Sequence, residues 1–62
     1  DNRNTEKALE YFQKAVSSFQ SIEDKFGIAD TYYYIGEIYF EQNKLNEALE
    51  YNNKSVALSR EL

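Results

Sequence analysis

The chain has no cysteine, no histidine and no proline, and only two glycines. Without cysteine there is no disulfide, and without histidine as well a structural zinc site is disfavoured. The thiol nucleophile and the imidazole general base are missing too, and no Gly-rich phosphate loop is present. We therefore expect no enzymatic activity, no cofactor and no metal.

The charge balance and the lack of long apolar runs disfavour two classes of partner, nucleic acids and membranes. Eleven acidic residues against seven basic ones give a net charge of −4, which repels a phosphate backbone, so we do not expect nucleic acid as a partner. No run approaches the roughly 20 apolar residues that span a bilayer, and no signal-peptide pattern is present. We expect no membrane partner, and the compartment stays open, with the cytoplasm slightly favoured.

One segment of the chain occurs twice. The sequence ALEYFQKAV at residues 8–16 returns forty residues later as ALEYNNKSV at residues 48–56. A fixed period of this size is typical of helical repeat arrays, whose repeats are packing units. A single unit of this length buries only about 60% of the surface exposed by its unfolded form. Oligomerisation or a larger parent chain would supply the missing stability.

The apolar spacing predicts three helices, because the residues that break helices are nearly absent. We expect them at about residues 4–23, 25–42 and 45–62. The short connections force neighbouring helices to be antiparallel. Tyrosine favours strands, but the three consecutive tyrosines Tyr32–Tyr34 are assigned to the second helix because the helical period continues on both sides.

Particular residues are expected to begin and end these helices. Asn4 and Asp24 are plausible N-caps, because their side chains can accept hydrogen bonds from free backbone N–H groups. Glu6 is expected in the first turn, where the helix dipole favours a carboxylate. Asn43 is expected to close the second helix in the left-handed conformation.

The span of residues 28–58 resembles a tetratricopeptide repeat, and residues 4–22 resemble the second helix of a preceding repeat. The forty-residue spacing is similar to the subclass found in polarity scaffolds and bacterial signalling proteins. The resemblance implies an all-α fold of about one and a half repeats, an antiparallel hairpin plus a third helix. It also implies a protein-binding scaffold without catalysis. The positions expected to pack the repeat are Ala8, Phe12, Ala15, Tyr32, Ile35, Gly36, Tyr39 and Ala48.

The third helix departs from this pattern. Asn52 and Ser55 replace the expected aromatic and small apolar residues, and Ser59 replaces the phenylalanine of the first copy. Polar residues at these positions suit a helix that faces water at the C-terminal end of an array. A separate apolar face remains on this helix, made of Leu45, Leu49, Val56 and Leu58, and Leu62 extends the expected stripe.

In the family geometry, the first helix of the complete repeat lines a concave surface. Its groove-facing residues would be Asp30, Tyr33, Glu37, Phe40 and Glu41. Carboxylates favour a basic or amide-rich segment, and aromatic rings lose little entropy on binding. Tyr33 and Glu37 stand where the family's lysine and asparagine clamp would be, which disfavours a C-terminal carboxylate as ligand. The alternative is a solvated helix face.

Three functional hypotheses follow from these observations. The first is an interaction module that binds a protein, as a peptide or a partner helix. The second is a self-assembly unit, because an unfinished repeat should expose Phe12 and Phe19 to a second copy of the chain. The third is a stand-alone bundle whose third helix folds back onto that stripe. Tyr11 and Tyr51 are expected to be half-buried, and Tyr34 and Ile38 to contact the neighbouring helix.

Overall fold

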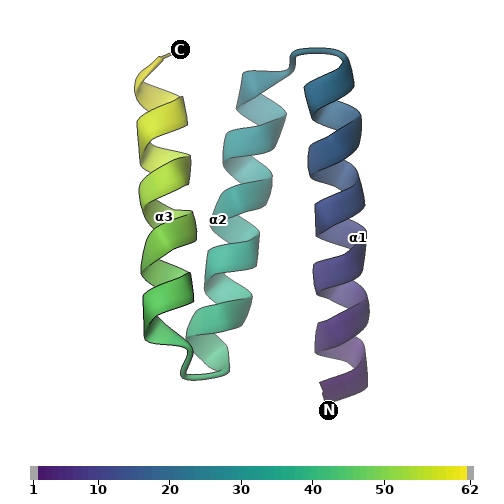
Figure 1. Cartoon of the computed structure of the whole chain (residues 1–62), viewed down its shortest axis with the longest axis vertical. Coiled ribbons are helices and arrows are strands. Elements are labelled where there is room, and N and C mark those ends of the chain that lie inside the picture. The colour runs from purple at the N-terminus through teal and green to yellow at the C-terminus, as the bar shows by residue number, and fades with distance from the viewer. Residues whose placement is uncertain (1, 62) are drawn as a thin grey trace.

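The fold is a single layer of three antiparallel helices. The computed structural model describes residues 2–61, with side chains from residue 4 onward. The helices are α1 (Asn2–Ser21), α2 (Lys25–Glu41) and α3 (Leu45–Arg60), and Figure 1 shows α2 lying between the other two. The smallest dimension of the molecule is 11 Å, about the diameter of one helix. The expected all-α class, with a hairpin and a third helix, is confirmed.

All helix packing passes through α2. It packs against both neighbours, and within the described residues no Cα atom of α1 lies within 8 Å of a Cα atom of α3. The hypothesis of a bundle in which α3 folds back onto α1 is therefore wrong. The physical reason is that α2 itself covers Phe12 and Phe19, and α3 packs on the other side of α2.

The ends of α1 and α3 differ from the expected ones. Because α1 begins at Asn2, Asn4 lies inside the helix and does not cap it, and Glu6 falls beyond the first turn. At the other end of the chain, α3 ends at Arg60, and Leu62 lies outside the described residues.

The two turns between helices have the same structure, twenty positions apart. Glu23 (φ 55°) and Asn43 (φ 62°) are in the left-handed region. The backbone N–H of Asp24 donates to the carbonyl of Phe19 at 2.9 Å, and that of Lys44 donates to the carbonyl of Tyr39 at 2.9 Å. This pattern is the Schellman motif, which satisfies the last carbonyls of a helix. Asn43 behaves as predicted, whereas the left-handed Glu23 was not expected.

The start of α2 is capped as predicted and the start of α3 is not capped by a side chain. Asp24 Oδ1 accepts a hydrogen bond from the backbone N–H of Gly27 at 3.0 Å. Lys44 occupies the corresponding position before α3 and makes no such bond. Its ammonium instead lies 5.8 Å from the ring centroid of Tyr39, a cation–π distance.

The buried core is built mainly on α2, as its central position requires. The buried residues of α2 are Ile28, Ala29, Thr31, Ile35 and Gly36, and Ala48 is the buried residue of α3. Ile35 is only 1% exposed. The hydroxyl of Thr31 donates to the carbonyl of Gly27 at 2.7 Å, so this buried polar group has a partner, as buried polar groups require.

Small residues allow α2 and α3 to pack closely along their interface, which we call the α2–α3 seam. A Cβ added at Gly36 would lie 3.3 Å from the carbonyl oxygen of Ala48 and 3.5 Å from the backbone nitrogen of Asn52. The Ser55 hydroxyl donates to the carbonyl oxygen of Ala29 at 2.7 Å across the seam. Ser55 therefore links α3 to α2 by a hydrogen bond. The sequence pattern, in which Ser55 replaces a small apolar residue, did not predict this role.

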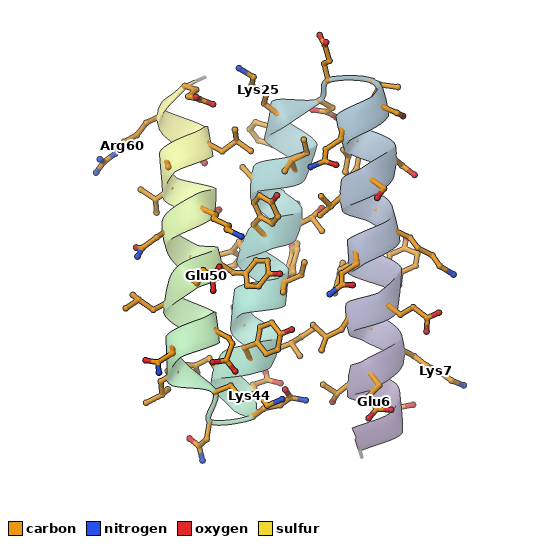
Figure 2. All side chains as sticks on the ribbon, in the orientation of Figure 1. Glu6, Lys7, Lys25, Lys44, Glu50 and Arg60 are labelled. Carbon is orange, nitrogen blue, oxygen red and sulfur yellow. The ribbon has the colours of Figure 1, made fainter. Side chains whose placement is uncertain are left out.

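Tyrosine rings pack along the same seam. The ring of Tyr51 lies 5.7 Å from that of Tyr39 and 5.7 Å from that of Tyr32. The Lys54 ammonium lies 5.0 Å from the Tyr51 centroid. Figure 2 shows side chains filling the spaces between α2 and both neighbours, with Lys44 at the turn into α3. Tyr51 is half-buried, as predicted.

The seam between α1 and α2 is closed by phenylalanines. The ring of Phe12 stacks on Tyr34 at 5.8 Å, and a Cβ added at Gly27 would lie 2.7 Å from the Phe19 ring. Phe12 and Phe19 are therefore half-buried and not exposed as a free stripe, because α2 covers them. Tyr11, on the other side of α1, is 69% exposed, so the expectation that it is half-buried is wrong.

Candidate interaction surface

The residues predicted to face a groove lie together on one side of α2. They are Asp30, Tyr33, Glu37, Phe40 and Glu41, all exposed, and we call them the acidic–aromatic face. Helical spacing puts them on the opposite side of α2 from the buried Ile28 and Ile35. The core therefore holds α2 in place by one side and leaves the other side uncovered by the described chain.

Two hollows lie between the acidic–aromatic face and α3. Their volumes are about 180 Å³ and 200 Å³, and Tyr33 lines both. The first is lined by Phe26, Ala29, Asp30, Tyr33, Ser55 and Ser59. The second is lined by Tyr33, Gly36, Glu37, Phe40, Glu41 and Asn52. Together they form a groove that runs along the α2–α3 seam, and every residue of the acidic–aromatic face lines it.

The groove includes residues that sequence reasoning did not assign to it. Phe26 is 72% exposed and lines the first hollow, and the α3 wall consists of Asn52, Ser55 and Ser59. A signal for Phe26 was available, because Phe26, Tyr33 and Phe40 follow one another at intervals of seven residues. Residues two helical turns apart lie nearly in line along one side of a helix.

The acidic–aromatic face carries the carboxylates of Asp30, Glu37 and Glu41. The ion pairs between described side chains are Lys14–Glu10, Lys25–Glu61 and Lys54–Glu50, and none includes a residue of this face. The hydrogen bond and the negative charge of Glu37 raise the pKa of Tyr33 above its ordinary value. Within the described residues, no ion pair therefore neutralises the negative charge of the face.

A larger hollow lies on the opposite side of the layer. It has a volume of about 370 Å³ and is lined by Gln20, Ile28, Tyr32, Lys54, Ala57, Leu58 and Glu61. Ile28 and Tyr32 belong to the packed seams of α2, so this hollow lies over the core where α1 and α3 do not meet. Another hollow, of about 350 Å³, lies on α1 and is lined by Tyr11, Lys14, Ala15, Ser18 and Phe19.

The described residues contain neither an arrangement for a metal ion nor a helix that could span a membrane. No cluster of three or more acidic side chains there has the arrangement needed to hold a metal ion. None of the described helices combines the length and the apolar character that crossing a membrane requires.

Antiparallel helices joined by identical turns, with a forty-residue internal repeat, define a helical-repeat protein. The family model described as Tetratricopeptide repeat matches residues 1–61, and the chain belongs to this family. The searches of curated proteins and of solved structures found no match. Tetratricopeptide repeats are typically non-catalytic, and membership of the family indicates a protein-interaction module.

Proposed function

We propose that this chain is a non-catalytic scaffold that binds a peptide or partner helix through the acidic–aromatic face. The observation that carries the proposal is the groove between α2 and α3. All five residues of the face line it, they are exposed, and nothing in the described chain covers them.

The chemistry of the groove favours a basic or amide-rich partner. Tyr33 and Phe40 are 46% and 65% exposed, and each offers a flat apolar surface with few rotatable bonds to immobilise. Asp30, Glu37 and Glu41 add negative charge along the same side of the helix, which attracts cations and speeds their association. A partner's C-terminal carboxylate would meet Glu37 and be repelled, and nucleic acid would be repelled in the same way.

The proposal is tested by truncating the two aromatic side chains. We expect Tyr33→Ala and Phe40→Ala to weaken binding to an array of lysine-rich and arginine-rich peptides and to leave thermal stability nearly unchanged, because both rings are exposed. Tyr11→Ala is the matched control, since Tyr11 is an exposed aromatic on a different helix. Strong destabilisation by either groove variant would make that ring a core residue and refute its assignment to the groove.

The second candidate is a homo-oligomer. It is favoured because α1 carries a copy of the α3 surface that packs against α2, and no described helix covers this copy. Ala8, Tyr11 and Ala15 are the counterparts, forty positions earlier, of Ala48, Tyr51 and Ser55, which pack against α2. A helix like α2 would fit this side of α1. A second copy has no free α2 to offer, so such a dimer requires helix exchange. The test is light scattering over a concentration series, with helicity followed in parallel by circular dichroism. Helix exchange predicts a dimer whose helicity falls on dilution, and a helical monomer at all concentrations rules the exchanged dimer out.

A further inference from the structure

We propose that the ligand of the groove is an amphipathic α-helix with a basic edge, seated between α2 and α3 in the way that α2 itself is seated on α1. The inference rests on the proposed function and specifies its partner. Its basis is the internal repeat, which supplies two copies of one helix surface, one covered and one uncovered.

The covered copy is on α1. Leu9, Phe12, Val16 and Phe19 follow one another at gaps of three and four residues and form one side of the helix. All four are half-buried. Phe12 stacks on Tyr34 and Phe19 meets Gly27, and α1 contacts no other helix of the described chain. The chain therefore shows what covers this surface: a helix with a small residue opposite Phe19 and an aromatic residue opposite Phe12.

The uncovered copy is on α3. Forty positions on from Leu9 and Val16 are Leu49 and Val56, which are 61% and 50% exposed, and Leu45 beside them is 58% exposed. We call these three residues the aliphatic ridge. A helix end that simply faces water explains the polar Asn52 and Ser59, but it does not explain three exposed aliphatic side chains on the same side. A docked helix accounts for both.

Helical spacing puts the aliphatic ridge beside Asn52 and Ser59, on the side of α3 next to the groove. Asn52 and Ser59, the counterparts of Phe12 and Phe19, line the two hollows together with Tyr33. A helix placed on α3 as α2 is placed on α1 therefore lies against α2 as well. It is flanked by aliphatic side chains on one side, and by aromatic and acidic side chains on the other. Helix-in-groove recognition uses this arrangement, with apolar anchors at helical spacing and complementary charges at the edge.

The differences between the two copies define the ligand further. The Phe19 ring is so close to Gly27 that the covering helix has no room for a side chain at that position. Ser59 replaces the ring with a hydroxyl, which leaves space for a large apolar side chain on the ligand. Asp30 and Glu37 form no ion pair with a described side chain, and their negative charge calls for lysine or arginine on the ligand edge next to α2.

The test uses a designed helix as the probe. It is the peptide of residues 25–41, held helical by a covalent link between its positions 32 and 36 and carrying Gly27→Leu, Asp30→Lys and Glu37→Lys. The link adds bulk at the glycine side, so that the peptide cannot replace α2 in its own seam with α3. The control peptide is identical but keeps Gly27. Both are titrated into the isotopically labelled 62-residue chain and followed by NMR.

We expect the leucine peptide to bind at least tenfold more tightly than the control, because it buries one more leucine side chain. In the chain, Leu49→Glu should weaken binding at least tenfold, while Ala57→Glu, at an exposed α3 position outside the groove, should not change it. Circular dichroism checks that the variants fold. Equal affinity of the two peptides, no binding of either, or indifference to Leu49→Glu would overturn the helical seating.

The outcomes also separate this inference from the proposed function. In one outcome, Tyr33→Ala and Phe40→Ala weaken binding of the basic peptides, while Leu49→Glu does not change binding of the helical probe. The acidic–aromatic face is then supported as a binding site, and the proposal of a helical ligand is refuted. If Leu49→Glu weakens binding of the probe and the two alanine variants change neither assay, the acidic–aromatic face is refuted. The seating of the ligand between α2 and α3 is then refuted with it, and contact with α3 alone remains.

Discussion

Gly36 provides the most direct test of the packing between α2 and α3. A Cβ at this position would lie 3.3 Å from a backbone oxygen, that of Ala48, and a backbone atom can move away only if the whole helix shifts. Gly36→Ala gains about 1 kcal/mol of helix propensity and has to displace α3 by only a few tenths of an ångström. The two effects oppose each other, so we expect a change within about 1 kcal/mol.

Gly36→Leu has no such balance. Leucine places three more carbons than alanine in the interface between α2 and α3, and overpacking of this kind costs about 1–3 kcal/mol of stability. Separating the helices also weakens the hydrogen bond from Ser55 to Ala29, which contributes about 1 kcal/mol. After the gain in helix propensity, a net loss of about 2 kcal/mol remains. Since 1 kcal/mol shifts Tm by about 4–8 °C in a domain of this size, Tm should fall by roughly 10 °C.

The assay is thermal and urea unfolding followed by circular dichroism. Ala57→Leu is the control, because it adds the same side chain at an exposed position of α3 and should leave Tm nearly unchanged. If Gly36→Leu is as stable as the parent chain, α2 and α3 do not approach closely at this point, and the alignment of residues 28–58 with a tetratricopeptide repeat is wrong in register.

Three further predictions concern single contacts. Ser55→Ala removes the hydroxyl that donates to the Ala29 carbonyl at 2.7 Å, and urea unfolding should show a loss of about 1 kcal/mol; no loss would mean that water replaces the bond. Glu23→Gly should stabilise the chain by about 0.5–1 kcal/mol in the same assay, because Glu23 has φ 55° and glycine adopts this conformation without strain. Tyr33 should ionise at a higher pH than an ordinary tyrosine, because hydrogen bonding and charge from Glu37 raise its pKa. Since the raised pKa favours the protonated folded form, this contribution to stability is present below the ordinary tyrosine pKa and is lost as pH rises through the raised one. Absorbance titration should show Glu37→Gln moving the midpoint down, and an unchanged midpoint would contradict the assigned cause.

The sequence was sufficient to predict the three helices, the left-handed turn at Asn43 and the side of α2 that is exposed, but not the left-handed Glu23. Apolar spacing fixed the helix order, and Asp24 and Asn43 marked the turn chemistry. The start of α1 was misplaced because Asn4 is a good cap by residue type, while the helix begins at Asn2. The Ser55 hydrogen bond was missed because a serine in place of a small apolar residue gives no indication that its hydroxyl will meet a carbonyl of another helix.

The exposure of the repeated residues could not be predicted from either copy alone. Tyr11 and Tyr51 occupy equivalent places in the two copies, yet Tyr11 is 69% exposed and Tyr51 is half-buried between Tyr32 and Tyr39. The exposure of the two tyrosines differs because this side of α3 faces α2, whereas the same side of α1 faces away from α2. Burial in this chain is therefore set by which side of each helix faces α2.

This dependence on α2 also bears on the proposed binding site. The helix in the centre buries one side in the core and has a neighbour along each flank, so the uncovered part of it is the acidic–aromatic face. Each outer helix uses one side against α2 and leaves another free, and the free side of α3 is the one that adjoins the groove. A partner that enters the groove therefore meets charge and aromatic rings from α2 and aliphatic side chains from α3. That combination suits a folded, amphipathic ligand better than an extended chain, whose unpaired backbone groups would find few hydrogen-bond partners on helices that already satisfy their own.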